Sequence, residues 1–299
     1  MKKYLSLILA VVCSFALLVG CGNSTSNSSA NENDNSVSST DGLDPTVDYA
    51  ALAGSTIKIA ASPTPHAEIL AVAKDILAKQ DITLEIVEFT DYVQPNMATE
   101  SGSVFANYFQ HQPYLDDFNA KKSTHLKGVA PIHYEPFGLY PGKTAAIDEL
   151  ADGAQIAVPN DGTNEGRALY LLEAQGLITI REDAGLTATI LDIVDNPKNL
   201  DIVELEAAQI PRSLGSVDMA VINGNYALQA GLHPGEDALV LEDSTETGAE
   251  AAKLYANVLC IHEDNADSDL AKALIAAVES DAVRTFITDT YNGGVVAMF

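Results

Sequence analysis

The sequence is poor in positive charge. Its 299 residues include 16 lysines and arginines against 42 aspartates and glutamates, which gives a formal net charge of −26 at pH 7. A chain of this charge is repelled by nucleic acid and by anionic lipid surfaces. We therefore expect no nucleic-acid partner. Solubility alone accounts for the acidity, which says little about the fold.

Cysteine is also scarce, with three residues in the whole chain. Cys13 and Cys21 lie near the N-terminus, so Cys260 has no partner for a disulfide within the rest of the chain. Cys260 stands in an apolar, strand-like run from Tyr255 to Ile261. A buried and unreactive thiol is the expected state there.

Several motifs of catalysis and metal binding are missing. Gly142-Lys143-Thr144 is no phosphate-binding loop, because Phe137 occupies the upstream glycine position. No Gly-x-Ser-x-Gly elbow occurs, and the six histidines form no closely spaced pair of metal ligands. We expect no catalytic residue, no cofactor and no metal. The enzymatic alternative is an exported hydrolase that uses His111 as its base.

Long apolar runs are absent as well. The longest, Leu5 to Leu18, has about 14 residues, whereas a membrane span needs roughly 20. It follows Lys2 and Lys3 and ends at Leu18-Val19-Gly20-Cys21. A charged start, a short apolar core and small residues before a cysteine are typical of a bacterial lipoprotein signal. We predict cleavage before Cys21, lipid on Cys21, and a location on the extracytoplasmic face of the cell membrane. A single spanning anchor is the alternative.

The organisation follows from composition and periodicity. Residues 1–20 form the signal peptide, and residues 21–50 hold the lipidated cysteine and an Asn- and Ser-rich tether that cannot build a core. The remainder alternates strand-like and helical stretches, which predicts an α/β fold with largely parallel sheets. Two lobes with a cleft between them are expected, 51–138 plus 254–299 as lobe 1 and 139–253 as lobe 2. Strands are expected at 57–60, 82–89, 155–159, 202–205, 219–222 and 239–241, and helices at 65–79, 95–101, 113–120, 164–175, 208–214, 268–279 and 281–291.

Three segments could bind a ligand. The first, Pro159 to Arg167, follows a strand and opens a helix, where backbone N–H groups favour an anion. A cation in the first helical turn is electrostatically disfavoured, so Arg167 is explained if it faces a bound carboxylate. Alternatively, Arg167 pairs with Glu165 or Glu206.

The second segment, Ala106 to Tyr114, gathers aromatic residues and a histidine in a chain with 6% aromatics and no tryptophan. Together with Tyr92 it could line a pocket for an apolar or sulfur-containing side chain. The alternative is an aromatic cluster of the core.

The third segment, Val221 to Tyr226, delivers Asn223 and Asn225 from a buried strand into a glycine-containing loop. Amides bind ammonium or carboxylate groups. Turn formation and a helix N-cap explain the same residues without a ligand.

These segments together resemble the NlpA-type methionine-binding lipoproteins, the substrate-binding subunits of methionine ABC importers. The resemblance runs from about Gly54 to Phe299. The blocks that carry it are PTPHAEIL (63–70), FTDYV (89–93), NYFQHQPYL (107–115), VPNDGTNEGRAL (158–169), NPKNL (196–200), ELEAAQIPRSL (204–214) and VINGNYAL (221–228).

The resemblance implies a two-lobed periplasmic-binding-protein fold that closes on its ligand and delivers it to a membrane permease with its ATPase. It implies that Arg167 clamps the amino acid carboxylate and that Asn164, Asn223 and Asn225 hold its backbone groups. It also implies an aromatic pocket around the thioether. That pocket would comprise Tyr92, Phe109, His111 and Tyr114. L-methionine is the expected ligand, with D-methionine, a methionine derivative, a methionine-containing dipeptide, or a role as surface adhesin or sensor as alternatives.

Overall fold

The computed structural model describes residues 42–242 and 251–299. The predicted signal peptide, the lipidation site Cys21 and most of the predicted tether lie outside these residues. Leu43, Val47 and Tyr49 belong to the expected tether, yet they pack against the core beside the larger sheet. Ordered structure therefore begins before residue 50.

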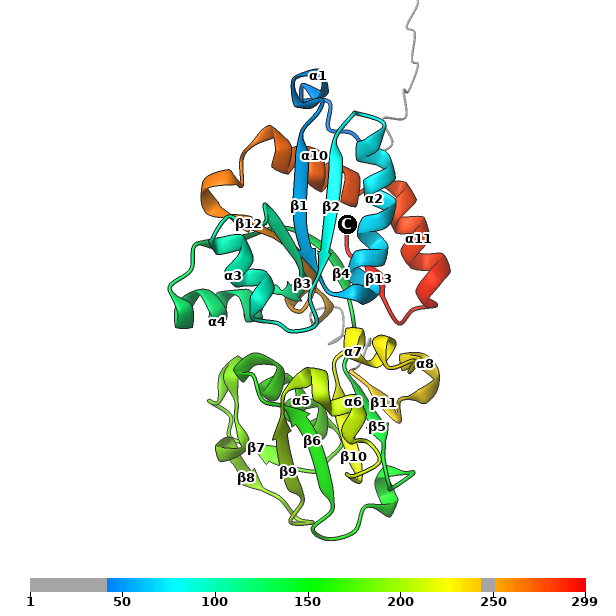
Figure 1. Ribbon diagram of the computed structural model, residues 1–299. Helices are drawn as coiled ribbons and strands as arrows, with labels where there is room; N and C mark the ends of the chain where they lie inside the picture. The colour runs from blue at the N-terminus through cyan, green and yellow to red at the C-terminus, as the bar shows by residue number, and fades with distance from the viewer. Residues whose placement is uncertain (1–41, 243–250) are drawn as a thin grey trace, which may run out of the picture. The chain divides into compact units, whose positions relative to one another are not determined.

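The larger sheet has the strand order β13-β4-β12-β3-β1-β2 (Figure 1). β1 pairs in parallel with β2 and β3, whereas β12 is antiparallel to both β3 and β4. Its strands are β1 (Thr56–Ala61), β2 (Thr83–Glu88), β3 (Ala106–His111), β4 (Leu126–Tyr134), β12 (Asn257–His262) and β13 (Val296–Ala297). The helices of the same chain segments are α1 (Tyr49–Leu52), α2 (Glu68–Ala78), α3 (Gln94–Glu100), α4 (Gln112–Lys122), α10 (Asp269–Val278) and α11 (Asp281–Tyr291).

The second sheet has the order β11-β5-β10-β6-β9. β6 pairs in parallel with β9 and β10, and β5 is antiparallel to β10 and β11. Its strands are β5 (Gly138–Pro141), β6 (Gln155–Pro159), β9 (Asp201–Leu205), β10 (Met219–Ile222) and β11 (Val240–Leu241), beside the small pair β7 (Thr179–Ile180) and β8 (Ile193–Asp195). Its helices are α5 (Gly162–Ala174), α6 (Ile210–Ser213), α7 (Gly224–Gln229) and α8 (Pro234–Asp237).

Each sheet has its own apolar core. The first core gathers Ile57, Ile59 and Leu70 among others, and the second gathers Ile156, Leu169 and Val221. The expectation of an α/β fold is confirmed. The expectation of largely parallel sheets is wrong in part, because the chain leaves the first sheet after β4 and re-enters it with β12 in the opposite direction.

Pro131 lies within β4 and does not end it. The pairing of β4 with β12 shifts register before Val258, which faces Pro131, and again after Leu259. An irregular ladder tolerates the missing N–H of proline. β4 thus reaches Tyr134, and the crossing to the second sheet begins at Glu135.

Among residues 42–242 and 251–299, none of the helices is both long and apolar enough to cross a bilayer.

Candidate functional site

One cavity is lined by segments of both sheets. The empty space between its walls is about 340 Å³, a figure that includes space open to solvent. All eight residues that the sequence singled out for ligand binding lie on its wall. Its lining comprises Tyr92, Phe109, Gln110, His111, Tyr114, Glu135, Phe137, Asn164, Arg167, Asn223, Gly224, Asn225 and Asn257.

The aromatic side of the cavity follows from the alternation of β3. Phe109 and His111 are two residues apart and share one face of the strand, whereas Tyr108 packs into the first core on the other face. The Tyr92 ring lies 5.7 Å from Phe109 and 5.8 Å from Tyr114, centroid to centroid. Phe109 and Tyr114 are buried together with Phe118. Both interpretations of the aromatic segment are therefore correct, because the cluster forms a small core and also one wall of the cavity.

A hydrogen-bond chain fixes the orientation of two amides. Asn164 donates from Nδ2 to both carboxylate oxygens of Asp161, at 2.9 and 3.0 Å. Its Oδ1 must then accept, and it lies 3.1 Å from His111 Nε2 and 3.2 Å from Asn223 Nδ2. Asn223 Nδ2 is therefore used in this series of hydrogen bonds, and Asn223 Oδ1 is not. Oδ1 is buried and has no hydrogen-bond partner among the described residues.

Asn225 is oriented in the opposite sense. The Tyr92 hydroxyl donates to Asn225 Oδ1 at 2.6 Å. Its Nδ2, a donor, is buried without a partner among the described residues. Although Asn223 stands at the N-cap position of α7, its side chain makes no capping bond. One unpaired acceptor and one unpaired donor thus line the same cavity, and turn chemistry does not explain them.

Arg167 is buried and flat between two rings, with its Cζ 4.1 Å from the Phe137 centroid and 4.3 Å from that of Tyr255. Nε donates to Glu242 at 2.8 Å, and Nη2 donates to the Glu135 carbonyl at 2.9 Å. No hydrogen bond to Nη1 occurs among the described residues.

Arg167 does pair with a glutamate, as the alternative held, but the partner is Glu242 and not Glu165 or Glu206. Glu165 instead accepts from the backbone N–H of Ile190 at 2.9 Å. The expected anion site at the start of α5 is also filled from within the chain. Asp161 caps the helix by accepting from the N–H of Asn164 at 3.0 Å.

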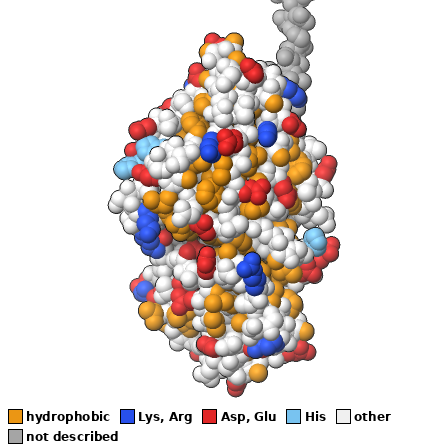
Figure 2. Space-filling view, viewed as in Figure 1, with side chains coloured by type: hydrophobic (Ala, Val, Ile, Leu, Met, Phe, Trp, Pro, Cys, Tyr) orange, Lys and Arg blue, Asp and Glu red, His pale blue; other side chains and the backbone are white. Residues whose placement is uncertain are grey.

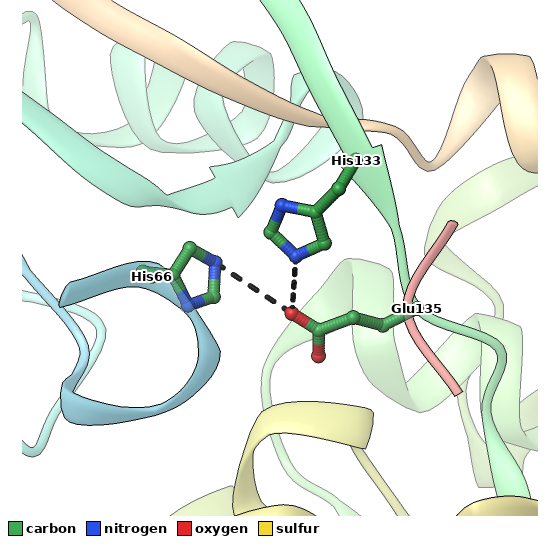
Figure 3. A group of neighbouring side chains, drawn as sticks. All are labelled: His66, His133 and Glu135. Carbon is green, nitrogen blue, oxygen red and sulfur yellow. Dashed lines mark hydrogen bonds and ion pairs between the residues drawn. The ribbon is translucent and has the colours of Figure 1, made fainter. Parts of the chain in front are cut away.

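Glu135 is a cavity residue that the sequence reasoning missed. Two histidine rings point at its carboxylate, His133 from β4 and His66 from the helical turn Pro63–Ala67 after β1 (Figure 3). His133 Nε2 lies 2.6 Å and His66 Nε2 3.7 Å from Glu135 Oε1. The only signal in the sequence was a lone acidic residue in the otherwise apolar crossing from Pro131 to Tyr140.

The two histidine rings beside Glu135 are uncharged. Burial lowers the pKa of His66 to about 4 and that of His133 to about 3. The Tyr108 hydroxyl hydrogen-bonds to His133 Nδ1, and Asn257 Oδ1 accepts from His66 Nε2 at 2.9 Å. Burial raises the pKa of the Glu135 carboxyl. The Glu135 carboxyl thus reaches the cavity with two neutral rings behind it, and a cation in the cavity would favour its ionised form.

His111 is unsuited to act as a general base. Burial, and next the charge of Arg167, lower the pKa of its ring to about 3. Nε2 is bonded to Asn164, and Nδ1 accepts from the N–H of Tyr114 at 3.2 Å. Both nitrogens are therefore occupied by structural bonds. Cys260 is buried as expected, and burial raises the pKa of its thiol to about 12.

Comparison with known proteins places the chain among the lipoproteins that it resembles. The NlpA lipoprotein family matches residues 57–299. The D-methionine-binding lipoprotein MetQ of Escherichia coli (strain K12) is 44% identical over 227 residues, 75% of this chain and 80% of that protein. Membrane lipoprotein TpN32 of Treponema pallidum is 41% identical over 242 residues, 81% of this chain and 88% of that protein.

A solved structure agrees with this. A nutrient-binding protein from Burkholderia cenocepacia, bound to methionine, is 41% identical and has a TM-score of 0.76, covering 81% of this chain and 100% of that one. The two-lobed binding-protein fold is thereby confirmed. The chain belongs to the NlpA lipoprotein family.

Proposed function

We propose that this NlpA-family lipoprotein captures a free amino acid, methionine above all, and delivers it to an ABC transporter. The observation that carries the proposal is one cavity wall that holds two side chains of opposite charge and two unpaired amide atoms. A cation, Arg167, and an anion, Glu135, lie on its wall with an unpaired donor on Asn225 and an unpaired acceptor on Asn223. A zwitterion supplies the complement of all four.

The carboxylate of the ligand is assigned to Arg167 Nη1 and Asn225 Nδ2, because both are donors. The ammonium is assigned to the Glu135 carboxylate and Asn223 Oδ1, because both accept. A buried donor or acceptor without a partner is unfavourable by about 1–3 kcal/mol. A bound zwitterion satisfies these groups, so affinity is gained by relieving them as well as by new attraction. Asn164 and His111 serve the site indirectly: Asn164 bonds to Asn223 and His111 bonds to Asn164, which together orient the Asn223 amide.

The aromatic side of the cavity suits the ligand side chain. Tyr92, Phe109 and Tyr114 offer ring edges and faces, and contacts between a thioether and an aromatic ring contribute about 0.3–1.5 kcal/mol each. The methionine named in the Burkholderia structure and the D-methionine in the name of the Escherichia coli relative support a methionine side chain. L-methionine is the first ligand to test and D-methionine the second. A methionine derivative and a methionine-containing dipeptide follow as competitors.

The place of action follows from the family and the predicted signal. We assign 1–20 to the signal peptide and Cys21 to the lipid anchor on the extracytoplasmic face. Residues 51–138 with 254–299 form lobe 1 and 139–253 form lobe 2, joined where the cavity lies. Ligand binding favours the closed arrangement, and a permease with its ATPase reads that closure. No bond of the ligand is made or broken.

The test is calorimetric titration of ligand-free protein with four compounds. They are L-methionine, D-methionine, a Gly-Met dipeptide, and a methionine analogue that has hydrogen in place of the ammonium group. One-to-one binding of one methionine isomer and no detectable heat with the analogue is the expected result. Equal binding of methionine and the analogue would refute the ammonium assignment, and no heat with any compound would refute the function and favour a surface adhesin or sensor.

A further inference from the structure

A second group of possible ligand atoms lies outside the cavity. Glu100 ends α3, His125 precedes β4, and His262 ends β12. One ligand atom of each residue lies within 4.8 Å of the others. Asn257, at the other end of β12, lines the cavity, and five strand residues correspond to roughly 17 Å. The group is therefore separate from the amino acid site.

We propose that Glu100, His125 and His262 bind a divalent transition-metal ion of the zinc class. Two imidazoles and one carboxylate form a common zinc ligand set, with water in the fourth position. Bonds of about 2.0–2.1 Å in a tetrahedron place ligand atoms roughly 3.3 Å apart. The observed distances are 2.9 Å from His125 Nδ1 to Glu100 Oε1 and 4.0 Å from His262 Nε2 to Glu100 Oε2. The two distances run to different oxygens of the carboxylate, so an ion would use both oxygens of Glu100 or draw one ring closer to a single oxygen.

The carboxylate is held in place for this role. The backbone N–H of His125 donates to Glu100 Oε2 at 2.8 Å, and the His125 ring contacts the other oxygen, Oε1. A metal ion bound to His125 Nδ1 and Oε1 would replace this contact, and the two atoms would move apart from 2.9 Å to roughly 3.3 Å. The pairing of His262 with Leu126, next to His125, sets the two rings side by side, with centroids 6.0 Å apart.

His262 is held at its other ring nitrogen, where Nδ1 accepts from the backbone N–H of Asp264 at 3.3 Å. A metal ion on Nε2 would place the ring proton on Nδ1 and end this bond. The Asp264 carboxylate, whose Oδ2 lies 3.6 Å from Nδ1, would then be the acceptor that orients the ligating ring. The site is open to solvent, since 60% of the His125 side chain is exposed. Figure 2 shows histidine side chains beside acidic ones at one edge of the molecular surface.

The buried group His66, His133 and Glu135 is a weaker metal candidate, although its ligand atoms are equally close. The His133 ring is hydrogen-bonded at both nitrogens, to Tyr108 and to Glu135. A metal ion there would displace both bonds around two fully buried rings. The surface group would lose the bond between His125 and Glu100 and the one that His262 Nδ1 accepts, but it lies open to solvent.

The experiment uses protein without a histidine tag, stripped with a chelator and titrated with Zn²⁺ by calorimetry. Co²⁺ absorbance reports the coordination geometry. We expect one ion per chain for the parent protein and for His233→Ala, a matched loss of an exposed histidine. Asp264→Asn should weaken binding by roughly 10–100-fold. Loss of a direct ligand in His262→Ala, His125→Ala or Glu100→Gln should weaken it further.

Unchanged Zn²⁺ affinity in the His125→Ala/His262→Ala double variant would overturn the proposal, because diffuse binding by acidic residues would then be its source. Equal affinity for Mg²⁺, which prefers oxygen ligands, would overturn it as well. Methionine titrations of the same variants show whether they are folded. The metal site and the amino acid site can fail independently, since they share no residue.

Discussion

The Tyr92 hydroxyl donates to Asn225 Oδ1 across 2.6 Å and 133 positions of the chain. Tyr92 follows β2 of the first sheet, and Asn225 lies in α7, after β10 of the second. The Tyr226 hydroxyl makes a second such bond, to the Thr90 carbonyl at 3.1 Å. The bond from Tyr92 both joins the two sides of the cavity and decides that Asn225 presents a donor to it.

Replacement of Asn225 by aspartate tests the polarity of that position. Asn225→Asp exchanges the free donor for an acceptor of similar shape, which repels the ligand carboxylate. We expect methionine affinity to fall by about 1–3 kcal/mol or more. Tyr92→Phe removes only the hydrogen bond that orients the Asn225 amide, so methionine affinity should fall less in this variant. Calorimetry on both variants checks this, and stronger binding by the aspartate variant would reverse the assignment.

Glu135→Gln removes the anion that faces the ligand ammonium and keeps the volume. Methionine affinity should fall by about 2–5 kcal/mol, since a charged group loses its partner in a buried site. The variant should distinguish less than the parent does between methionine and the analogue without an ammonium group. Titration of parent and variant with both compounds gives the comparison. A variant that discriminates as strongly as the parent would show that Glu135 does not contact the ammonium.

Arg167 and Glu242 form an ion pair, and substitution of the two residues should have different effects on methionine binding. Arg167→Ala removes the cation and leaves Glu242 buried alone, so both methionine binding and stability should fall, the former by about 2–5 kcal/mol. Glu242→Gln retains the guanidinium between its two rings and should reduce affinity less. Denaturant unfolding with calorimetry separates the two effects. Equal loss of affinity in both variants would mean that Glu242 positions Arg167 completely.

Glu165 should make stability depend on pH. Burial raises the pKa of its carboxyl to about 7, from 4.5 in the unfolded chain. The folded state therefore binds more protons between these values, so this stabilisation is complete below about 4.5 and is lost as pH rises through about 7. Between pH 5 and pH 8 the free energy of unfolding of the parent should fall by on the order of 1–3 kcal/mol more than that of Glu165→Gln.

Urea unfolding at the two pH values measures that difference. Glu173→Gln is the matched control, because Glu173 lies on the same helix and also accepts a backbone N–H, from Ile180 at 2.7 Å. A parent and a Glu165→Gln variant with parallel pH profiles would contradict the assignment.

The sequence predicted the wall of the cavity because local rules place its residues. Phe109 and His111 alternate on one strand, and Asn223 and Asn225 follow a fully apolar strand that must be buried. Loops after neighbouring strands meet at one edge of a sheet. These rules require no knowledge of distant partners, and all eight predicted residues lie on one cavity.

Long-range pairing was beyond local rules. Glu242 reaches Arg167 across 75 positions, and no periodicity connects them. The sequence analysis looked for closely spaced histidines, and neither histidine and glutamate group contains two. Glu100, His125 and His262 are far apart in sequence, whereas Glu135 stands two residues after His133. The sequence analysis did not predict that Asp161 caps α5, for a different reason. A helix start attracts any nearby anion, and the sequence does not say whether the chain supplies it.

A crystal structure of the protein grown with methionine tests the central claim most directly. The account predicts the ligand in the cavity with its carboxylate on Arg167 and Asn225 Nδ2, its ammonium on Glu135 and Asn223 Oδ1, and its thioether against Tyr92, Phe109 and Tyr114. A methionine bound with its ammonium toward Asn225 and its carboxylate toward Asn223, or bound outside this cavity, would contradict it.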